Sequence, residues 1–130
     1  MPELYRADHV GSLLRPAQVK QARSAFLAGH QTREQLERVE DEAILAALNH
    51  QKRSGVDIYT DGEFRRSGFQ NDLLDAVEGF IATEDPAVVR IWQGPGGDPQ
   101  EQGTRQVVAA KLNHVGRMTA RQSAFMIANA

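Results

Sequence analysis

The chain has 130 residues, of which 41% are hydrophobic and 25% are charged, a composition that is typical of one folded domain and excludes a disordered or collagen-like chain. Fifteen Lys and Arg residues against seventeen Asp and Glu residues give a formal charge of −2, which provides no basic surface for nucleic acid. Cysteine is absent and no apolar run is long enough for a signal peptide or a membrane span, so we expect a cytoplasmic protein without disulfides.

The first expected elements are a strand, a turn and a helix. Residues 4–9 have the mixed polarity of a short buried strand, and residues 10–12 would form the turn after it. Pro16 suits the first position of a helix, and Gly29 favours the left-handed conformation that ends one. The residues that recur at helical spacing between them are Val19, Ala22, Arg23, Phe26 and Leu27.

A second, longer helix is the most strongly patterned element. Thr32 followed by Gln35 has the spacing of a capping box, and the apolar residues beyond it mark one helical face as far as about Ser54. Gly55 would end this helix. The run 56–60 is β-prone and leads directly into an Asp-Gly-Glu turn, so the pattern predicts a helix, a tight turn, a strand and a polar tip.

The remaining segments change in character. Residues 69–80 are typical of a helix that ends at Gly79. Residues 87–92 and 105–110 are β-prone, and we expect them to pair as an antiparallel hairpin across a loop rich in glycine and proline. Thr119 can cap a final helix near the end of the sequence.

Polar residues gather at the ends of the two expected strands. In parallel α/β folds, ligand-binding groups lie just beyond the carboxyl ends of the strands, so residues 9–12 and 60–66 are expected side by side. Glu63 can form a salt bridge with a ligand ammonium or accept a proton, and Gly62 gives the backbone the freedom to aim it. The alternative interpretation is an ordinary Asp-Gly turn with solvated charges.

The first tip offers a complementary group. The amide and hydroxyl of Ser12 can hydrogen-bond a carboxylate, so Ser12 and Glu63 together would hold the two charges of an amino acid. The alternative is that Ser12 bonds only to local backbone. His9 can donate to a ligand, although the four histidines show no metal-ligand spacing. Glu40 or Asp41 can support the strand ends from the inner side, or else be solvated.

Three segments together point to one protein family more specifically than any one of them does alone. They are residues 7–16 (ADHVGSLLRP), 39–44 (VEDEAI) and 60–66 (TDGEFRR). In order and separation they resemble the cobalamin-independent methionine synthase family, and above all its shorter stand-alone members with one catalytic barrel. The resemblance extends through essentially the whole chain.

This resemblance implies an α/β fold, a (βα)8 TIM barrel in which a zinc-bound homocysteine thiolate takes a methyl group from a folate or another donor. It places Ser12 at the carboxylate of homocysteine and Glu63 at its ammonium. Val10 and Gly11 would contribute backbone to the same pocket, and Arg66 would support it.

His9 and Asp61 are further supporting candidates. His9 differs from the threonine that is common in the long-chain synthases and is usual in the shorter relatives, so the methyl donor stays open. No catalytic residue is identified in this segment.

The family's zinc ligands are a histidine, two cysteines and a glutamate from later strands, and none of them can be matched to a residue here. Zinc ligation keeps a thiol deprotonated, and a chain without cysteine cannot build that site alone. The resemblance therefore predicts that residues 1–130 are the N-terminal portion of a single barrel, incomplete in this chain and inactive in isolation, with a β-hairpin excursion at about residues 81–112.

Two other interpretations stay open. The chain can be a self-contained binding module that dimerises through exposed barrel edges. It can also be part of a barrel related to the uroporphyrinogen decarboxylases, although the pairing of Ser12 with Glu63 argues against this. In each case we expect the segment to self-associate, because an open barrel exposes strand edges and apolar helix faces.

Overall fold

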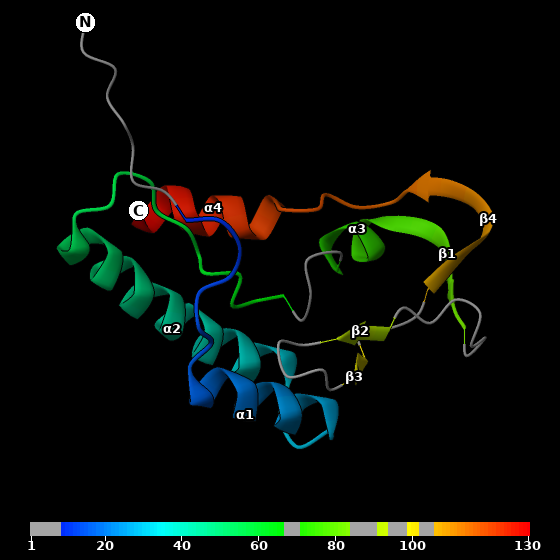
Figure 1. Cartoon of the computed structure of the whole chain (residues 1–130), viewed down its shortest axis with the longest axis horizontal. Coiled ribbons are helices and arrows are strands. Elements are labelled where there is room, and N and C mark those ends of the chain that lie inside the picture. Colours follow the sequence, from blue (N-terminus) through cyan, green and yellow to red (C-terminus); the bar gives the residue numbers. More distant parts are fainter. Residues whose placement is uncertain (1–8, 67–70, 84–90, 94–98, 102–105) are drawn as a thin grey trace, which may run out of the picture. The chain divides into compact units, whose positions relative to one another are not determined.

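The structure, a computed structural model, describes residues 9–66, 71–83, 91–93, 99–101 and 106–130 (Figure 1). These residues form a mixed α/β chain with two compact units. The first unit comprises Met1–Ser67 and Thr119–Ala130, and the second comprises Gly68–Met118. None of the helices in the described part of the chain has the length and apolar character needed to cross a membrane.

The first unit is built on a pair of helices, and both were predicted from the sequence. Helix α1 (Ala17–Leu27) begins directly after Pro16 and packs against helix α2 (Arg33–Ser54). The predicted capping box starts α2, because Thr32 Oγ1 accepts from Gln35 N at 3.3 Å while Gln35 Oε1 accepts from Thr32 N at 2.8 Å. Gly55 ends α2 in the left-handed conformation, as expected.

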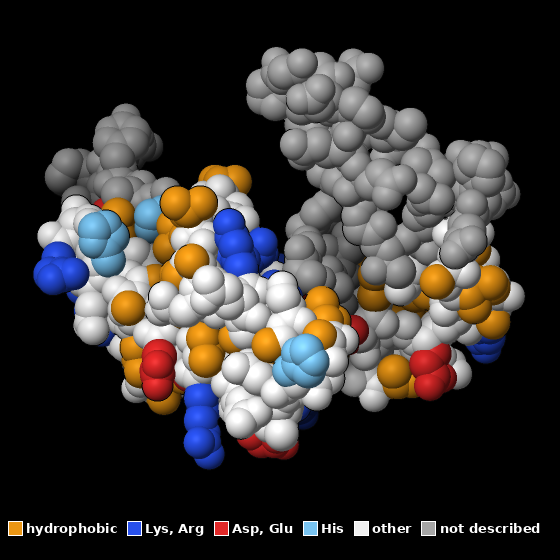
Figure 2. Space-filling view, turned by 90° about the horizontal axis from the view of Figure 1, so that it is seen from below, with side chains coloured by type: hydrophobic (Ala, Val, Ile, Leu, Met, Phe, Trp, Pro, Cys, Tyr) orange, Lys and Arg blue, Asp and Glu red, His pale blue; other side chains and the backbone are white. Residues whose placement is uncertain are grey.

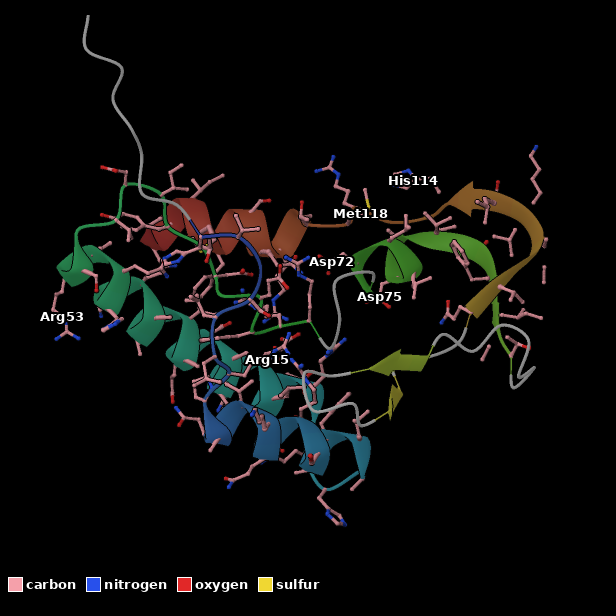
Figure 3. The ribbon with its side chains drawn as sticks, viewed as in Figure 1. Arg15, Arg53, Asp72, Asp75, His114 and Met118 are labelled. Carbon is pink, nitrogen blue, oxygen red and sulfur yellow. The ribbon has the colours of Figure 1, made fainter. Side chains whose placement is uncertain are left out.

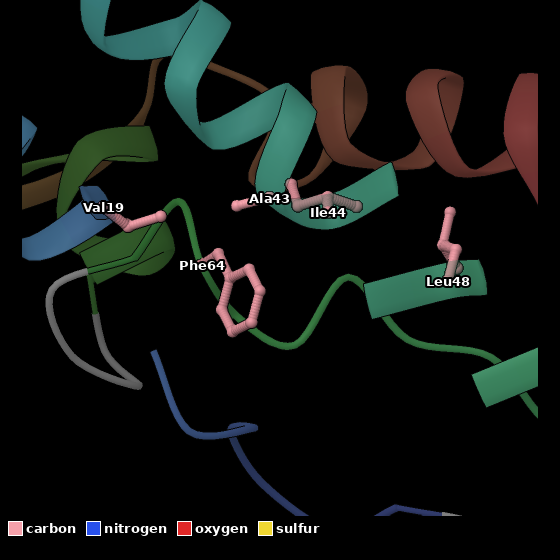
Figure 4. Packing of buried hydrophobic residues seen from close by; sticks show 5 residues of the cluster. All are labelled: Val19, Ala43, Ile44, Leu48 and Phe64. Carbon is pink, nitrogen blue, oxygen red and sulfur yellow. The ribbon is translucent and has the colours of Figure 1, made fainter. Parts of the chain in front are cut away.

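The core of the first unit lies between these helices and the segment that follows α2 (Figure 4). Its fully buried members come from both helices and from the polar segment after α2: Val19, Ala43, Ile44, Leu48 and Phe64. Phe64 belongs to the Asp-Gly-Glu turn, so the candidate site is anchored directly in the hydrophobic core.

Helix α4 (Ala120–Asn129) belongs to the same unit and confirms the predicted final helix. Phe125 and Met126 pack against the core cluster. The predicted cap by the Thr119 side chain is wrong, since this side chain bonds to no helical N–H. Thr119 is the N-cap residue by position, and its Oγ1 accepts from Ser123 Oγ at 3.4 Å.

The predicted strand over residues 56–60 is also wrong, because this segment is irregular. A strand needs a ladder partner, and the expected neighbour at residues 4–9 lies outside the described residues except for His9, which is not in a strand. The N–H and C=O of Thr60 bond instead to the side chain of Gln51 on α2.

The second unit contains one short helix and four strands. Helix α3 (Asn71–Ala76) runs straight into β1 (Val77–Ala82), which pairs antiparallel with β4 (Gln106–His114). Strands β2 (Ile91–Gln93) and β3 (Pro99–Glu101) form a second antiparallel pair. Within the described residues no parallel strands pair.

Two predictions for this unit are wrong. The helix expected to reach Gly79 ends at Ala76. Residues 106–110 of the second expected hairpin strand belong to β4, which pairs with β1, whereas Ile91 and Trp92 pair with β3. Residues 87–90 and 105 lie outside the described residues. The pairing sets Phe80 opposite Val108, an aromatic and β-branched pair that favours a strand. A Cβ at Gly79 would lie 3.0 Å from the Lys111 carbonyl oxygen, so the glycine permits the close approach of β4.

Truncation of a core leucine and of an exposed leucine on the same helix should separate the contribution of packing to stability from that of helix propensity. We expect Leu48→Ala to lower the free energy of unfolding by about 2 to 5 kcal/mol, because Leu48 is 1% exposed and its removal leaves a cavity. Leu45→Ala, on the same helix but 39% exposed, should cost less than about 1 kcal/mol. Urea denaturation measures both, and equal losses would contradict this assignment of the core.

Candidate functional site

The two polar segments singled out from the sequence lie side by side. Leu13 N–H donates to the Gly62 carbonyl at 3.2 Å, so the loop of residues 10–13 runs along the turn of residues 60–66. Leu13 also packs against the core cluster, which holds this loop from beneath. The predicted adjacency of the two tips is therefore confirmed, although no strand precedes the second one.

The turn has an unusual backbone at two successive residues. Gly62 has a φ of 66° and Glu63 a φ of 58°, a left-handed conformation that is uncommon for a residue with a side chain. A Cβ at Gly62 would lie 2.9 Å from the Phe64 ring and 3.2 Å from the Leu13 Cβ. Only glycine fits there without a shift of these neighbours.

Local hydrogen bonds close this turn. Asp61 Oδ1 accepts from the Glu63 N–H at 2.9 Å, and Thr60 Oγ1 accepts from the Gly62 N–H at 3.2 Å. The first bond is an Asx-type contact, which mimics a backbone turn. Asp61, a predicted supporting residue, thus holds the conformation of Glu63 from within the turn.

Gln51 holds the beginning of the turn from helix α2. Its Oε1 accepts from Thr60 N at 2.9 Å, and its Nε2 donates to Thr60 O at 2.9 Å and to Ala47 O at 3.3 Å. Gln51 is only 2% exposed, so these bonds satisfy an amide that burial would otherwise penalise. The carboxamide replaces the strand partner that Thr60 lacks.

Arg23 holds the end of the turn from helix α1. Its Nη2 donates to Phe64 O at 2.6 Å and its Nη1 to Arg66 O at 2.8 Å. Nη2 also pairs with Glu40 Oε1 at 2.9 Å, and Glu40 is 2% exposed. One guanidinium therefore joins α1, α2 and the turn, and it confirms that Glu40 supports the turn from the inner side.

Asp41 supports the turn through a second arginine. Arg65 Nη2 bonds to Asp41 Oδ1, and the Arg65 guanidinium lies 4.4 Å from the centre of the Phe125 ring. Arg121 of α4 bonds to Glu37 and lies 3.8 Å from Asp41 Oδ1. Helix α4 is thus joined to α2 by charge and to the turn by a cation–π contact.

Burial and neighbouring charges alter two pKa values around the turn. Burial raises the pKa of Glu40, and the hydrogen bond and charge of Arg23 oppose this only in part. Burial also lowers the pKa of Arg15, with a further contribution from the nearby charge of Arg23. Arg15 Nη2 donates to Glu63 O at 3.2 Å, so this cation lies directly beneath Glu63.

The predicted ligand-binding side chains are accessible. Val10, Gly11 and Ser12 are exposed on the first loop, whereas His9 is half-buried. On the turn, Asp61, Glu63 and Arg66 are partly buried, and Arg66 Nη2 lies 3.4 Å from Glu63 Oε1. Ser12 is thus exposed on the loop, and the Glu63 side chain on the turn is 22% exposed.

The residues that hold the turn were missed as functional residues, yet the sequence contains a signal for them. Arg23 occurs in the apolar series of α1, and Gln51 continues the apolar face of α2 four residues after Ala47. A charged or amide side chain on a buried helical face needs a partner, and here the partners are the carbonyl and amide groups of the turn.

The residues present do not fit the zinc site that the family resemblance implies. In the described part of the chain, no three His, Asp or Glu side chains stand together as a possible metal site, and the sequence has no cysteine. On the face shown in Figure 2, basic, acidic and apolar side chains lie interspersed.

Comparison with protein families places this geometry in context. Residues 6–116 match the family model described as "Cobalamin-independent synthase, Catalytic domain". A solved structure, described as a vitamin-B12-independent methionine synthase from Listeria monocytogenes, is 41% identical with a TM-score of 0.51. This likeness covers 58% of this chain and 23% of that one.

Curated relatives agree with this result. The uncharacterised protein YxjH of Bacillus subtilis is 51% identical over 83 residues, or 62% of this chain and 22% of that protein. Methionine synthase of Saccharolobus solfataricus is 29% identical over 83 residues, or 64% of this chain and 24% of that enzyme. The chain thus spans about a quarter or less of the length of the relatives that it matches.

The raised pKa of Glu40 predicts a specific pH dependence of stability. The folded protein binds a proton at Glu40 more readily than the unfolded chain does. The stability of the wild type relative to Glu40→Gln should therefore fall as the pH rises above about 4.3, the ordinary pKa of a glutamate. Arg23, and more weakly Arg65 and Arg33, oppose this shift. Urea titrations at several pH values measure the difference.

Glu42→Gln is the matched control, because Glu42 is exposed on the same helix. Because it lies at an exposed position, this substitution should change the free energy of unfolding by less than about 0.5 kcal/mol. If the Glu40→Gln difference grows in favour of the wild type with rising pH, attraction to Arg23 outweighs burial and the pKa assignment is wrong.

Proposed function

Because the chain belongs to the family of cobalamin-independent synthase catalytic domains, we propose that it forms the homocysteine-binding part of a methionine-synthase-like methyltransferase. The observation that carries this proposal is the hydrogen bond between Leu13 and Gly62, which brings the loop of Ser12 beside the turn of Glu63. Methionine synthases occur among the relatives, which supports the same reaction class.

In this proposal the two ends of the amino acid bind to the two segments. The Ser12 hydroxyl and amide donate to the carboxylate, and the Glu63 carboxylate accepts from the ammonium. Val10 and Gly11 contribute backbone, and His9 and Asp61 support the pocket. The locked backbone around Glu63 supports this role, because a fixed carboxylate loses little freedom when it binds a ligand.

The proposal assigns binding and orientation to this chain. During methyl transfer the bond between the donor and its methyl group breaks, and a new bond forms between that carbon and the homocysteine sulfur. No residue described in this chain is assigned to that step or to zinc. The proposal includes a (βα)8 barrel with a hairpin excursion at about residues 81–112, which the antiparallel pairing of β1 with β4 supports.

Titration calorimetry of the full chain with L-homocysteine and with L-methionine tests the binding mode. We expect Glu63→Gln to weaken both ligands by about tenfold or more, because a charge-assisted hydrogen bond to the ammonium is lost. Glu42→Gln removes the same charge from an exposed position on α2 and should leave both affinities unchanged. Equal affinities for wild type and Glu63→Gln would reject the proposed role of Glu63.

We also propose that the chain self-associates in solution. Among the described residues, both sheets have only two strands, and large apolar side chains of the first unit are exposed, including Val10, Leu14 and Leu27. Sedimentation velocity at micromolar concentration should therefore show a dimer or a larger species. A compact monomer over this range would contradict the expectation.

A further inference from the structure

The Glu63 carboxylate already has a cationic partner. Arg66 Nη2 lies 3.4 Å from Glu63 Oε1, and the two residues are three positions apart in the turn. The side chains are 26% exposed for Arg66 and 22% exposed for Glu63, so a solute can reach both charges. A ligand ammonium that binds Glu63 must therefore compete with the Arg66 guanidinium.

The backbone beneath this ion pair is held independently of it. Arg15 donates to the Glu63 carbonyl at 3.2 Å, and Arg23 donates to the Phe64 and Arg66 carbonyls at 2.6 and 2.8 Å. Asp61 accepts from the Glu63 N–H at 2.9 Å. The two charged side chains can thus exchange partners while the turn keeps its conformation.

An ammonium alone gains little from this exchange. It would replace one ion pair by another and separate Arg66 from the Glu63 carboxylate in a region that already contains Arg15 and Arg23. Like charges that approach one another in a partly buried site raise the free energy of that state. A ligand that brings its own carboxylate would compensate for this loss.

We propose that the Glu63–Arg66 pair selects zwitterions, with the ligand ammonium replacing Arg66 on Glu63 and the ligand carboxylate replacing Glu63 on Arg66. The exchange converts one ion pair into two. The ammonium and the carboxylate of an α-amino acid are attached to the same carbon, as neighbouring opposite charges. The carboxylate can accept from Ser12 and Arg66 together, because its two oxygens have several acceptor positions.

This inference rests on the proposed function and identifies Arg66 as a residue that determines specificity. If Arg66 had a purely structural role, its substitution would change stability and not ligand preference. The Arg66 group that Arg23 holds is the backbone carbonyl, which a side-chain substitution retains. We therefore expect Arg66 variants to fold and to differ in ligand preference.

The test compares two ligands, L-methionine and the amine formed by its decarboxylation, by titration calorimetry of the full chain. The wild type should prefer L-methionine. Arg66→Gln should weaken L-methionine and bind the amine as well as the wild type or more tightly, so the preference should fall by about tenfold or more. Arg66→Lys, which keeps the charge, should restore part of this preference.

Arg53→Gln is the matched control. Arg53 is exposed near the C-terminal end of α2, whereas Arg15 lies toward the opposite end of that helix (Figure 3). The preference of the Arg53→Gln variant for L-methionine over the amine should equal that of the wild type. Equal weakening of both ligands in Arg66→Gln, or no change in either, would overturn the inference and leave the proposed function intact. Failure of wild-type protein to bind L-methionine would reject both.

Discussion

The first unit depends on the contacts of one partly buried guanidinium. Arg23 leaves helix α1, pairs with Glu40 of α2, and donates to the carbonyl groups of Phe64 and Arg66. Carbonyl groups in an irregular, partly buried turn have no strand ladder to satisfy them, and an unpaired one is costly. The several N–H donors of arginine allow one side chain to bond to two carbonyls and a carboxylate at once.

The same principle applies at the other end of the turn. Gln51 bonds to both backbone groups of Thr60, and Phe64 fixes the middle of the segment in the core. Between these attachments, Glu63 adopts a left-handed backbone that would be unfavourable in isolation. Such conformations persist where the surroundings over-determine them, which is the case here. Burial raises the pKa of Glu40, and its hydrogen bond and ion pair with Arg23 oppose this in part.

Local signals in the sequence predicted the helices more successfully than the strands. The capping box at Thr32, the end of α2 at Gly55 and the adjacency of the two polar segments are all confirmed. The first two follow from short-range chemistry, whereas the adjacency was inferred from two expected parallel strands, and residues 56–60 form no strand. The strand at residues 56–60 was wrong because its β-propensity came without a described ladder partner, and the Gln51 amide took the backbone groups instead.

Long-range pairing was the second limit of prediction. Strand β4 pairs with β1, far back in the chain, because the missing side chain of Gly79 admits the β4 backbone and Phe80 meets Val108. Nothing local distinguishes this register from a hairpin with residues 87–92. The supporting roles of Arg23 and Gln51 likewise depend on partners distant in sequence, although their positions on apolar helical faces indicated burial.

The central claim is that a single amino acid bridges the loop of residues 10–13 and the turn of residues 60–66. The most direct measurement is a nuclear magnetic resonance titration of the isotope-labelled chain with L-methionine, followed at the backbone amides. We predict that the signals of Ser12 and Leu13 move together with those of Gly62 and Glu63, and that all four saturate at one ligand concentration. Movement in only one of the two segments, or in neither, would contradict the claim.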